Sequence, residues 1–263
     1  MNPLSDPGAR LVIAHRGTSA RFPENTAAAF DHARSLGVDA IEFDLRVSRD
    51  GVAVVIHDPT VDRTTDGTGA VESLTLTELE RLDAGFRFTR DGKTFPFRGQ
   101  GLRILTFDEL LTRYDSGPLL IEVKVATAVN EARRLIAEHG STARVLIDAA
   151  ATDAVLPFRG SELLTGACFD DVLRLLPRAF VGAAPAVLPY SALCIPRWYR
   201  GLPIPVVRLA RLARGRGVAT HVWTVNEPGV ARNLWKAGIN GIITDDPETM
   251  LLVRRELTES GAG

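Results

Sequence analysis

Three acidic residues in two short segments have the types and the spacing that cation binding requires. In residues 41–45 (IEFDL) acidic and apolar residues alternate. Because successive side chains of a strand point to opposite faces, Glu42 and Asp44 share one face, and Glu122 takes the same place in residues 120–124 (LIEVK). Like charges this close together are costly inside a protein unless something neutralises them. The three carboxylates therefore predict an all-oxygen site for a divalent cation, Mg²⁺ or Ca²⁺.

Two of the five histidines stand directly after predicted strands, where parallel-barrel enzymes place catalytic groups. His15 follows the apolar residues 11–14, and His57 follows the apolar residues 52–56. Two imidazoles can supply one general acid and one general base near neutral pH. For His221, a structural and a functional role both stay open.

Two basic residues accompany these groups. Arg16 directly follows His15, and Lys124 shares a predicted strand with Glu122. Only three of the 31 basic residues are lysines, so a lysine on an inward strand face indicates a specific role. Its compact point charge is suited to bind a phosphate oxygen. The alternative is that Lys124 only pairs with Glu122. A cation site, two imidazoles and two basic side chains around one pocket indicate phosphoryl chemistry on a diester.

The elements that would position these residues alternate between strands and helices along most of the chain. We expect strands at 11–14, 39–47, 52–57, 119–125, 144–148, 163–167, 193–195, 218–225 and 241–244, and helices at 25–35, 126–139, 170–179, 206–216, 228–237 and 247–256. This alternation predicts an α/β fold of the TIM (β/α)8 barrel type rather than a doubly wound sheet, whose glycine-rich phosphate loop does not follow the first strand. In such a barrel helices cover the outer face, so inward acids are not simply an exposed strand face.

One segment interrupts the alternation. Residues 59–106 are rich in Asp, Thr, Gly, Arg and Phe and contain a single helix-like stretch at 76–84. We expect a small cap-like insertion after an early strand rather than a second domain. The chain is therefore predicted to form one catalytic domain, residues 9–258.

Composition narrows the class of protein. The 31 basic and 32 acidic residues give a net charge of −1, which argues against a nucleic-acid partner. The longest apolar stretch, residues 181–196, is interrupted by prolines and is too short to cross a bilayer. Cys168 and Cys194 are interpreted as free thiols of a reducing compartment, with a disulfide as the lesser alternative. We therefore expect a cytoplasmic protein without a transmembrane segment.

Seven short motifs, in this order, resemble the glycerophosphodiester phosphodiesterase family. They are His15-Arg16-Gly17, Pro23-Glu24-Asn25-Thr26, Glu42-x-Asp44, His57-Asp58, Glu122-Val123-Lys124, Trp223-Thr224-Val225-Asn226 and residues 241–247 (GIITDDP). The resemblance spans about residues 11–250. The ordered set is much more specific than any single motif.

The resemblance implies a metal-dependent phosphoric diester hydrolase on a TIM barrel, which cleaves glycerophosphodiesters, small-molecule substrates, to sn-glycerol 3-phosphate and an alcohol. The implied metal ligands are Glu42, Asp44 and Glu122, the acid/base pair is His15 and His57, and the substrate-binding residues are Arg16, Lys124 and Trp223, the last with core packing as an alternative. In the implied route the metal activates the glycerol 2-hydroxyl, which attacks phosphorus to give a cyclic phosphate that water opens. Which histidine is the acid and which the base stays open.

Smaller expectations concern other residues of the motifs. Asn25 as a helix N-cap and Glu24 as a residue that orients Arg16 are alternative interpretations of residues 24–26, and neither is favoured. Asp245 is expected to cap the helix after Pro247 rather than to bind the metal.

Residues 147–151 (IDAAA) depart from the family, whose members often carry a Ser-Phe pair there, so the sequence does not predict which alcohol leaves. A rival activity is that of a lysophospholipase D or a sphingomyelinase-D-like enzyme, which would contact lysolipids transiently through an apolar groove. Phe86, Phe88, Phe95 and Phe97 could line this groove or could pack the insertion onto the barrel. A second alternative is a catalytically silent phosphodiester-binding barrel. The oligomeric state is not predicted.

Overall fold

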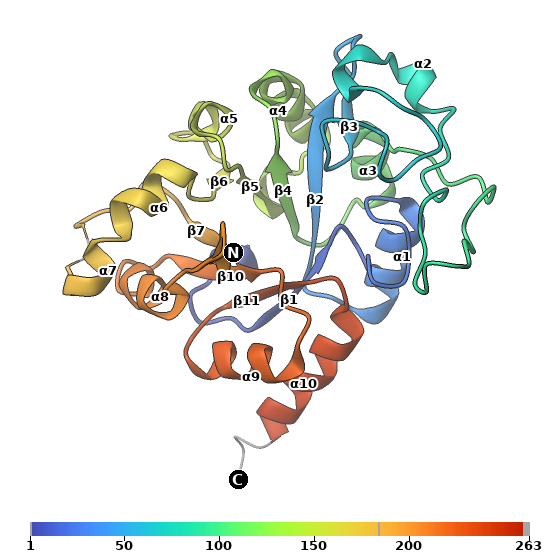
Figure 1. Cartoon of the computed structure of the whole chain (residues 1–263). Coiled ribbons are helices and arrows are strands. Elements are labelled where there is room, and N and C mark those ends of the chain that lie inside the picture. Colours follow the sequence, from blue (N-terminus) through green and yellow to red (C-terminus); the bar gives the residue numbers. More distant parts are fainter. Residues whose placement is uncertain (1, 184, 260–263) are drawn as a thin grey trace.

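A computed structural model describes residues 2–183 and 185–259 and shows a parallel β-barrel surrounded by helices (Figure 1). Within the described residues, eight parallel strands follow one another around the barrel in chain order, and the last pairs with the first. An isolated parallel bridge between Gly166 and Ala192 makes the barrel nearly closed. The strands are β1 (Leu11–His15), β2 (Ala40–Val47), β4 (Leu119–Val123), β5 (Val145–Asp148), β6 (Leu164–Thr165), β7 (Ala192–Pro196), β10 (Ala219–Trp223) and β11 (Gly241–Thr244). The predicted TIM-barrel fold is confirmed.

Helices cover the outer face of this barrel because the outward strand residues are apolar. Buried side chains such as Phe43, Phe107, Val222 and Trp235 fill the layer between strands and helices. The helices are α1 (Ala27–Leu36), α2 (Leu76–Leu79), α3 (Phe107–Arg113), α4 (Val129–Glu138), α5 (Thr152–Val155), α6 (Phe169–Leu175), α7 (Arg178–Val181), α8 (Val206–Arg214), α9 (Pro228–Lys236) and α10 (Pro247–Glu259). Short 3₁₀ helices are η1 (Pro3–Ser5), η2 (Val71–Ser73), η3 (Ala126–Ala128), η4 (Thr142–Arg144) and η5 (Leu156–Phe158). Among the described residues, no helix is both long enough and apolar enough to cross a membrane.

A separate cluster of apolar side chains fills the interior of the barrel and forms the floor of its mouth. Ile13 of β1 and Leu120 of β4 belong to this cluster, and Leu4 of η1 joins it. Because side chains alternate along a strand, the next inward positions toward the mouth are those of His15 and Glu122. Along each of these strands the inward side chains therefore change from apolar to charged within two residues.

His57 reaches the mouth by a route that the sequence did not indicate. The predicted strand at 52–57 is a shorter strand, β3 (Ala53–Val55), which pairs antiparallel with β2 instead of joining the barrel. In this hairpin the Ile56 N–H donates to the Asp44 carbonyl oxygen at 3.1 Å. The chain therefore returns to the level of the acidic residues, and His57 follows a hairpin strand rather than the barrel strand that we expected.

Other elements also differ from the predicted ranges. The helix expected at 170–179 is divided into α6 and α7, because Pro177 between them has no N–H to continue a helix. The short antiparallel hairpin of β8 (Trp198–Tyr199) and β9 (Leu202–Pro203), which follows β7, was not predicted. Helices α3 and α5 were not predicted either.

The phenylalanines of segment 59–106 pack against their neighbours. The ring of Phe97 lies 5.4 Å from that of Phe22, between centroids. The guanidinium carbon of Arg98 lies 4.1 Å from the ring centroids of both Phe86 and Phe95. Of the two interpretations of these residues, the structure favours packing over a groove.

Gly17, in the turn after β1, is a position where a side chain should strongly destabilise the fold. Gly17 has a φ of 83°, and a Cβ there would lie 2.7 Å from the carbonyl carbon of Ala29. Gly37, which ends α1, has a φ of 72° but open space around the same position. We expect Gly37→Ala to lower the free energy of unfolding by about 1 kcal/mol, from backbone strain alone. Gly17→Ala should lower the free energy of unfolding by about 1–3 kcal/mol more than Gly37→Ala does, because it adds a steric clash to the backbone strain. Urea denaturation of both variants measures the difference, and equal losses would contradict the close approach.

Candidate active site

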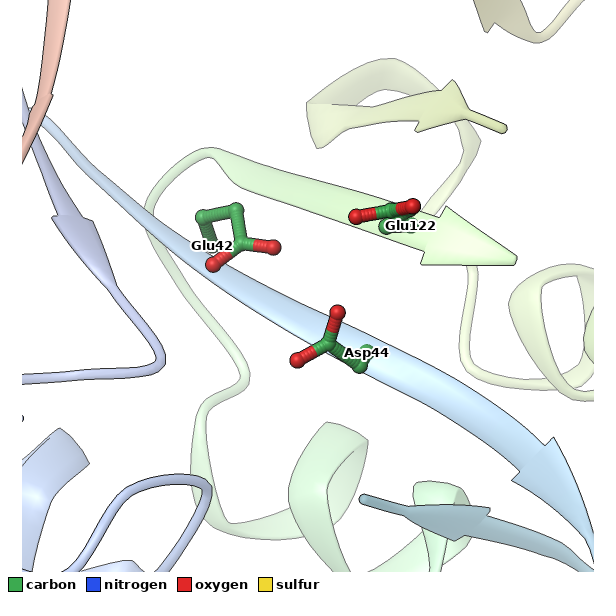
Figure 2. Close-up of side chains that lie close together, drawn as sticks. All are labelled: Glu42, Asp44 and Glu122. Atoms are coloured by element: carbon green, nitrogen blue, oxygen red, sulfur yellow. The ribbon is translucent and has the colours of Figure 1, made fainter. Parts of the chain in front are cut away.

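The three predicted metal ligands lie together at the mouth of the barrel. Glu42 and Asp44 are on β2, and Glu122 on β4 is the register partner of Asp44. Each residue offers one carboxylate oxygen, and these oxygens lie within 4.8 Å of one another. Figure 2 shows the carboxylates turned toward the same space between the two strands. The parallel pairing of β2 and β4 therefore assembles a group that is distant in the sequence.

Burial governs the charge of the two acids on β2. Glu42 is 5% exposed, and Asp44 is fully buried. Burial and the neighbouring Asp44 carboxylate raise the pKa of Glu42 to about 7. Burial also opposes ionisation of Asp44, but Lys124 and Arg16 outweigh it, so the pKa of Asp44 is lowered. Positive charge is thus required to keep both acids ionised.

Two basic side chains lie against these acids. Lys124 Nζ is 3.0 Å from Asp44 Oδ1 and 2.7 Å from Glu122 Oε2, so it contacts two carboxylates rather than Glu122 alone. Arg16 Nε is 3.2 Å from Asp44 Oδ2, and the backbone N–H of Arg16 donates to Glu42 Oε2 at 2.9 Å. Arg16 has a φ of 54°, a strained conformation for a residue other than glycine. These contacts hold it in that conformation.

The donor atoms fit a hard divalent cation. They are carboxylate oxygens, which Mg²⁺ and Ca²⁺ prefer, and Asp44 Oδ1 is buried with the positive charge of Lys124 Nζ at 3.0 Å. The other oxygen, Oδ2, accepts from Asn25 Nδ2 at 2.9 Å, a contact that fixes the orientation of the carboxylate. The N-cap of α1 is Thr26, so Asn25 does not cap this helix, which was one of the two open interpretations.

His15 is held by a carboxylate from the last strand of the barrel. Its Nδ1 lies 2.6 Å from Oδ1 of Asp245, which directly follows β11. Ser19 Oγ donates to the same oxygen at 2.9 Å. Burial acts to lower the pKa of His15, but the hydrogen bond with Asp245 and the charge of Glu42 outweigh burial, and the pKa is raised. Because Nδ1 is engaged, Nε2 is the nitrogen left for a ligand.

The expectation that Asp245 caps α10 is wrong for a simple geometric reason. Asp245 stands at the carboxyl end of β11, where its side chain points to His15 and accepts from Asn226 Nδ2 at 2.7 Å. The next residue, Asp246, contacts the first turn of α10 instead, since its Oδ2 accepts from Thr249 Oγ1 at 2.7 Å. The two neighbouring aspartates therefore divide the two tasks.

A series of charged contacts links His57 to Arg16. Its Nδ1 lies 2.6 Å from Asp58 Oδ1, and Arg63 Nε donates to Asp58 Oδ2 at 2.5 Å. Arg63 also donates to both oxygens of Glu24 at 2.7 Å, and Glu24 accepts from Arg16 Nη1 at 2.9 Å. Burial lowers the pKa of His57 below its ordinary value. Glu24 thus orients Arg16, which was the other open interpretation, whereas Arg63 was not singled out from the sequence.

One pocket joins these groups at the mouth of the barrel. Its lining includes His15, Arg16, Glu42, His57, Glu122, Lys124, Asp148, Cys194 and Trp223. All the predicted site residues except the fully buried Asp44 are among them. Trp223, at the end of β10, is 39% exposed and lines this pocket rather than the core.

Asp148 is a third carboxyl group in the lining of the pocket, and it was not predicted from the sequence. It is the register partner of Glu122, and its Oδ1 is buried without a hydrogen-bond partner among the described residues. Burial and the nearby charge of Glu122 raise its pKa well above the ordinary value. Gly166 provides the space, because a Cβ there would overlap this carboxyl group. Its position in the sequence could have indicated this role. Asp148 ends a strand and lies two residues after Leu146, so its side chain is on the same inward face.

His221 is a structural residue. It is fully buried in the barrel interior, and its Nε2 lies 2.8 Å from the carbonyl oxygen of Leu4. Burial lowers its pKa to about 4.

This chain matches the model of the glycerophosphoryl diester phosphodiesterase family over residues 15–249. The chain belongs to this family. The family and the enzyme class that the motifs predicted are thereby confirmed, and neither the lysophospholipase D alternative nor the silent barrel is favoured.

Individual relatives align with this chain over almost their whole length. A glycerophosphodiester phosphodiesterase of Caldanaerobacter subterraneus is 34% identical, with 93% of this chain and 98% of that protein covered. The crystal structure of a glycerophosphodiester phosphodiesterase from Agrobacterium tumefaciens is 26% identical and superposes with a TM-score of 0.74, covering 94% of this chain and 99% of that one. An Oleispira antarctica phosphodiesterase in complex with the product sn-glycerol-3-phosphate has the same fold, with a TM-score of 0.74 at 24% identity, covering 94% of this chain and 97% of that one.

The structural role of His221 predicts its titration. With a pKa of about 4 in the folded protein against 6.5 in the unfolded chain, His221 stays neutral at pH 5 while the unfolded chain binds a proton there. Its contribution to stability is therefore complete above pH 6.5 and falls by about 3 kcal/mol as the pH decreases to 4. Imidazole NMR spectra, with His221→Gln to assign the resonance, measure this pKa. A midpoint near 6.5 would contradict the buried, uncharged state.

Proposed function

We propose that this protein hydrolyses glycerophosphodiesters to sn-glycerol 3-phosphate and an alcohol, with a divalent cation and two histidines. One observation carries the proposal: two imidazoles, each bound to a carboxylate through Nδ1, line the same pocket as an oxygen-only cation site. Family membership and near full-length relatives of this name support the substrate class.

We assign the cation to Glu42, Asp44 and Glu122, and either Mg²⁺ or Ca²⁺ suits these oxygens. A cation bound there supplies charge that stabilises phosphate oxygens and makes a nearby hydroxyl more acidic. The buried position of Glu42 and Asp44 strengthens that charge, because few water molecules screen it.

We assign the proton transfers to His15 and His57. One removes the proton of the glycerol 2-hydroxyl as that oxygen attacks phosphorus, and the other protonates the oxygen of the leaving alcohol. Water then opens the resulting cyclic phosphate with the two roles reversed. Asp245 and Asp58 fix the rings so that Nε2 of each faces the substrate.

Arg16 and Lys124 bind the phosphate oxygens in this scheme, and Trp223 contacts the organic part of the substrate. Residues 59–106 contribute to the site through Arg63, which supports the idea of one catalytic domain with a small insertion. The protein is expected in the cytoplasm, since both of its cysteines are free and buried.

The direct test is release of glycerol 3-phosphate from a panel of water-soluble glycerophosphodiesters and lysophospholipids. We expect turnover of the soluble diesters, loss of turnover with a chelator, and recovery with Mg²⁺ or Ca²⁺. His15→Ala should reduce kcat by about 10²–10⁴-fold, because it removes a general acid or base. Activity on lysophospholipids alone would favour the rival enzyme, and no metal-dependent turnover would contradict both activities.

The carboxylate behind His15 gives a second prediction. Asp245→Asn keeps the size of the side chain but no longer stabilises a protonated His15, so kcat should fall about 10²-fold. Asp246→Asn is the matched control, since that residue contacts Thr249 rather than a histidine. Steady-state kinetics with a soluble diester compare the two variants. Equal effects would show that Asp245 has no special part in catalysis.

A further inference from the structure

One stretch of the chain carries an unusual charge. Between Asp171 and Glu227 the sequence contains eight arginines and no acidic residue, although the whole chain has a net charge of −1. This stretch includes the end of α6, all of α7, the β8–β9 hairpin and α8, whereas the first turn of α6 carries Asp170 and Asp171. In Figure 1 these helices, in yellow and orange, lie on the side of the barrel away from segment 59–106. The surface of the molecule is therefore electrostatically asymmetric.

Most of the large hydrophobic residues that are exposed lie in or next to this stretch. Of the eleven large hydrophobic residues that are exposed among the described residues, nine lie between positions 169 and 223. Trp198 and Leu202, on the hairpin, are 57% and 69% exposed. Where exposed apolar residues lie side by side, they usually mark an interaction surface.

Part of this surface lies at the catalytic mouth. We use "rim" for Phe169, Leu173, Trp198, Tyr199 and Leu202, which follow the carboxyl ends of β6 and β7. The rings of Phe169 and Tyr199 lie 5.4 Å apart, between centroids, and join the two loops. The backbone N–H of Arg197 donates to the carbonyl oxygen of Trp223, which lines the pocket. The rim is thus continuous with the entrance to the candidate active site.

Several arginines of this stretch have no acidic side chain in contact with them among the described residues. Arg200 lies over the ring of Tyr199 at 5.5 Å, and Arg208 lies over Phe180 at 5.3 Å. Within residues 2–183 and 185–259, no carboxylate lies within 4.0 Å of Arg174, Arg178, Arg200 or Arg208, whereas Arg197 has Glu227 at 3.5 Å.

We propose that the rim docks on an anionic lipid bilayer, with the mouth of the barrel facing the headgroups. Trp and Tyr favour the boundary between headgroups and acyl chains, Leu and Phe enter the apolar layer, and arginines bind lipid phosphates. A second copy of this chain fits poorly, because a symmetric contact would bring two cationic surfaces together. A nucleic acid would use the arginines but would leave the aliphatic side chains of Leu173 and Leu202 without a partner.

This inference goes beyond the proposed function and does not depend on it. Binding to a bilayer needs no substrate, no cation in the pocket and no turnover. A failure to bind vesicles would leave hydrolysis of soluble diesters unaffected, and a failure of hydrolysis would leave vesicle binding unaffected.

The test is flotation of the full chain with vesicles in a density gradient. We expect at least about tenfold more binding to mixed phosphatidylcholine and phosphatidylglycerol vesicles than to phosphatidylcholine alone, with a decrease as salt is added. Binding to neither vesicle, or equal binding to both, would overturn the proposal. A stable dimer seen by sedimentation without lipid would assign the rim to a second copy and would overturn it as well.

Two variants test the apolar and the charged parts of the surface separately. Trp198→Ser with Leu202→Ser, and Arg178→Glu with Arg200→Glu, should each reduce binding to the anionic vesicles about tenfold. Leu252→Ser and Arg255→Glu on the exposed side of α10 are the matched controls and should bind like wild type. Urea denaturation and turnover of a soluble diester verify that each variant is folded. Folded rim variants that still bind like wild type, or controls that lose as much binding, would overturn the proposal.

Discussion

The buried acids Glu42 and Asp44 impose the main constraint on this structure. Two carboxylates on one strand, both removed from water, repel each other and resist ionisation unless positive charge surrounds them. Arg16 and Lys124 provide part of that charge, and the arrangement of oxygens provides a place for a cation. The strained backbone of Arg16 is understandable in this light, because it brings a guanidinium and a backbone N–H to two different acids.

The orientation of His15 and His57 depends on two further acidic residues. Asp245 and Asp58 each hold an Nδ1 at 2.6 Å, and each is itself held by other polar groups. The contacts of Asp58 continue through Arg63 and Glu24 to Arg16. Arg63, in the segment between β3 and α3, therefore supports both His57 and Arg16 through Asp58 and Glu24.

The barrel also separates two kinds of surface around its mouth. On one side, charged side chains and packed aromatic rings of segment 59–106 stand beside His57. On the other side, exposed aromatic and aliphatic residues stand among arginines, of which Arg197 pairs with Glu227 and Arg200 lies over the ring of Tyr199. A barrel allows this division because its loops are independent of one another, while the strands beneath keep the reacting groups fixed.

The sequence by itself determined the barrel and most of the chemistry of its mouth. Alternation along single strands is a local property, so Glu42, Asp44, Glu122 and Lys124 could be placed on inward faces without any tertiary information. The tertiary structure alone decided the partners of these residues. Asp245 meets His15 because β11 closes the barrel against β1, and His57 returns to the mouth because β3 folds back on β2. Asp148 enters the pocket because Gly166 leaves it space. Such contacts join residues far apart in the chain, and local periodicity contains no information about which distant strands become neighbours.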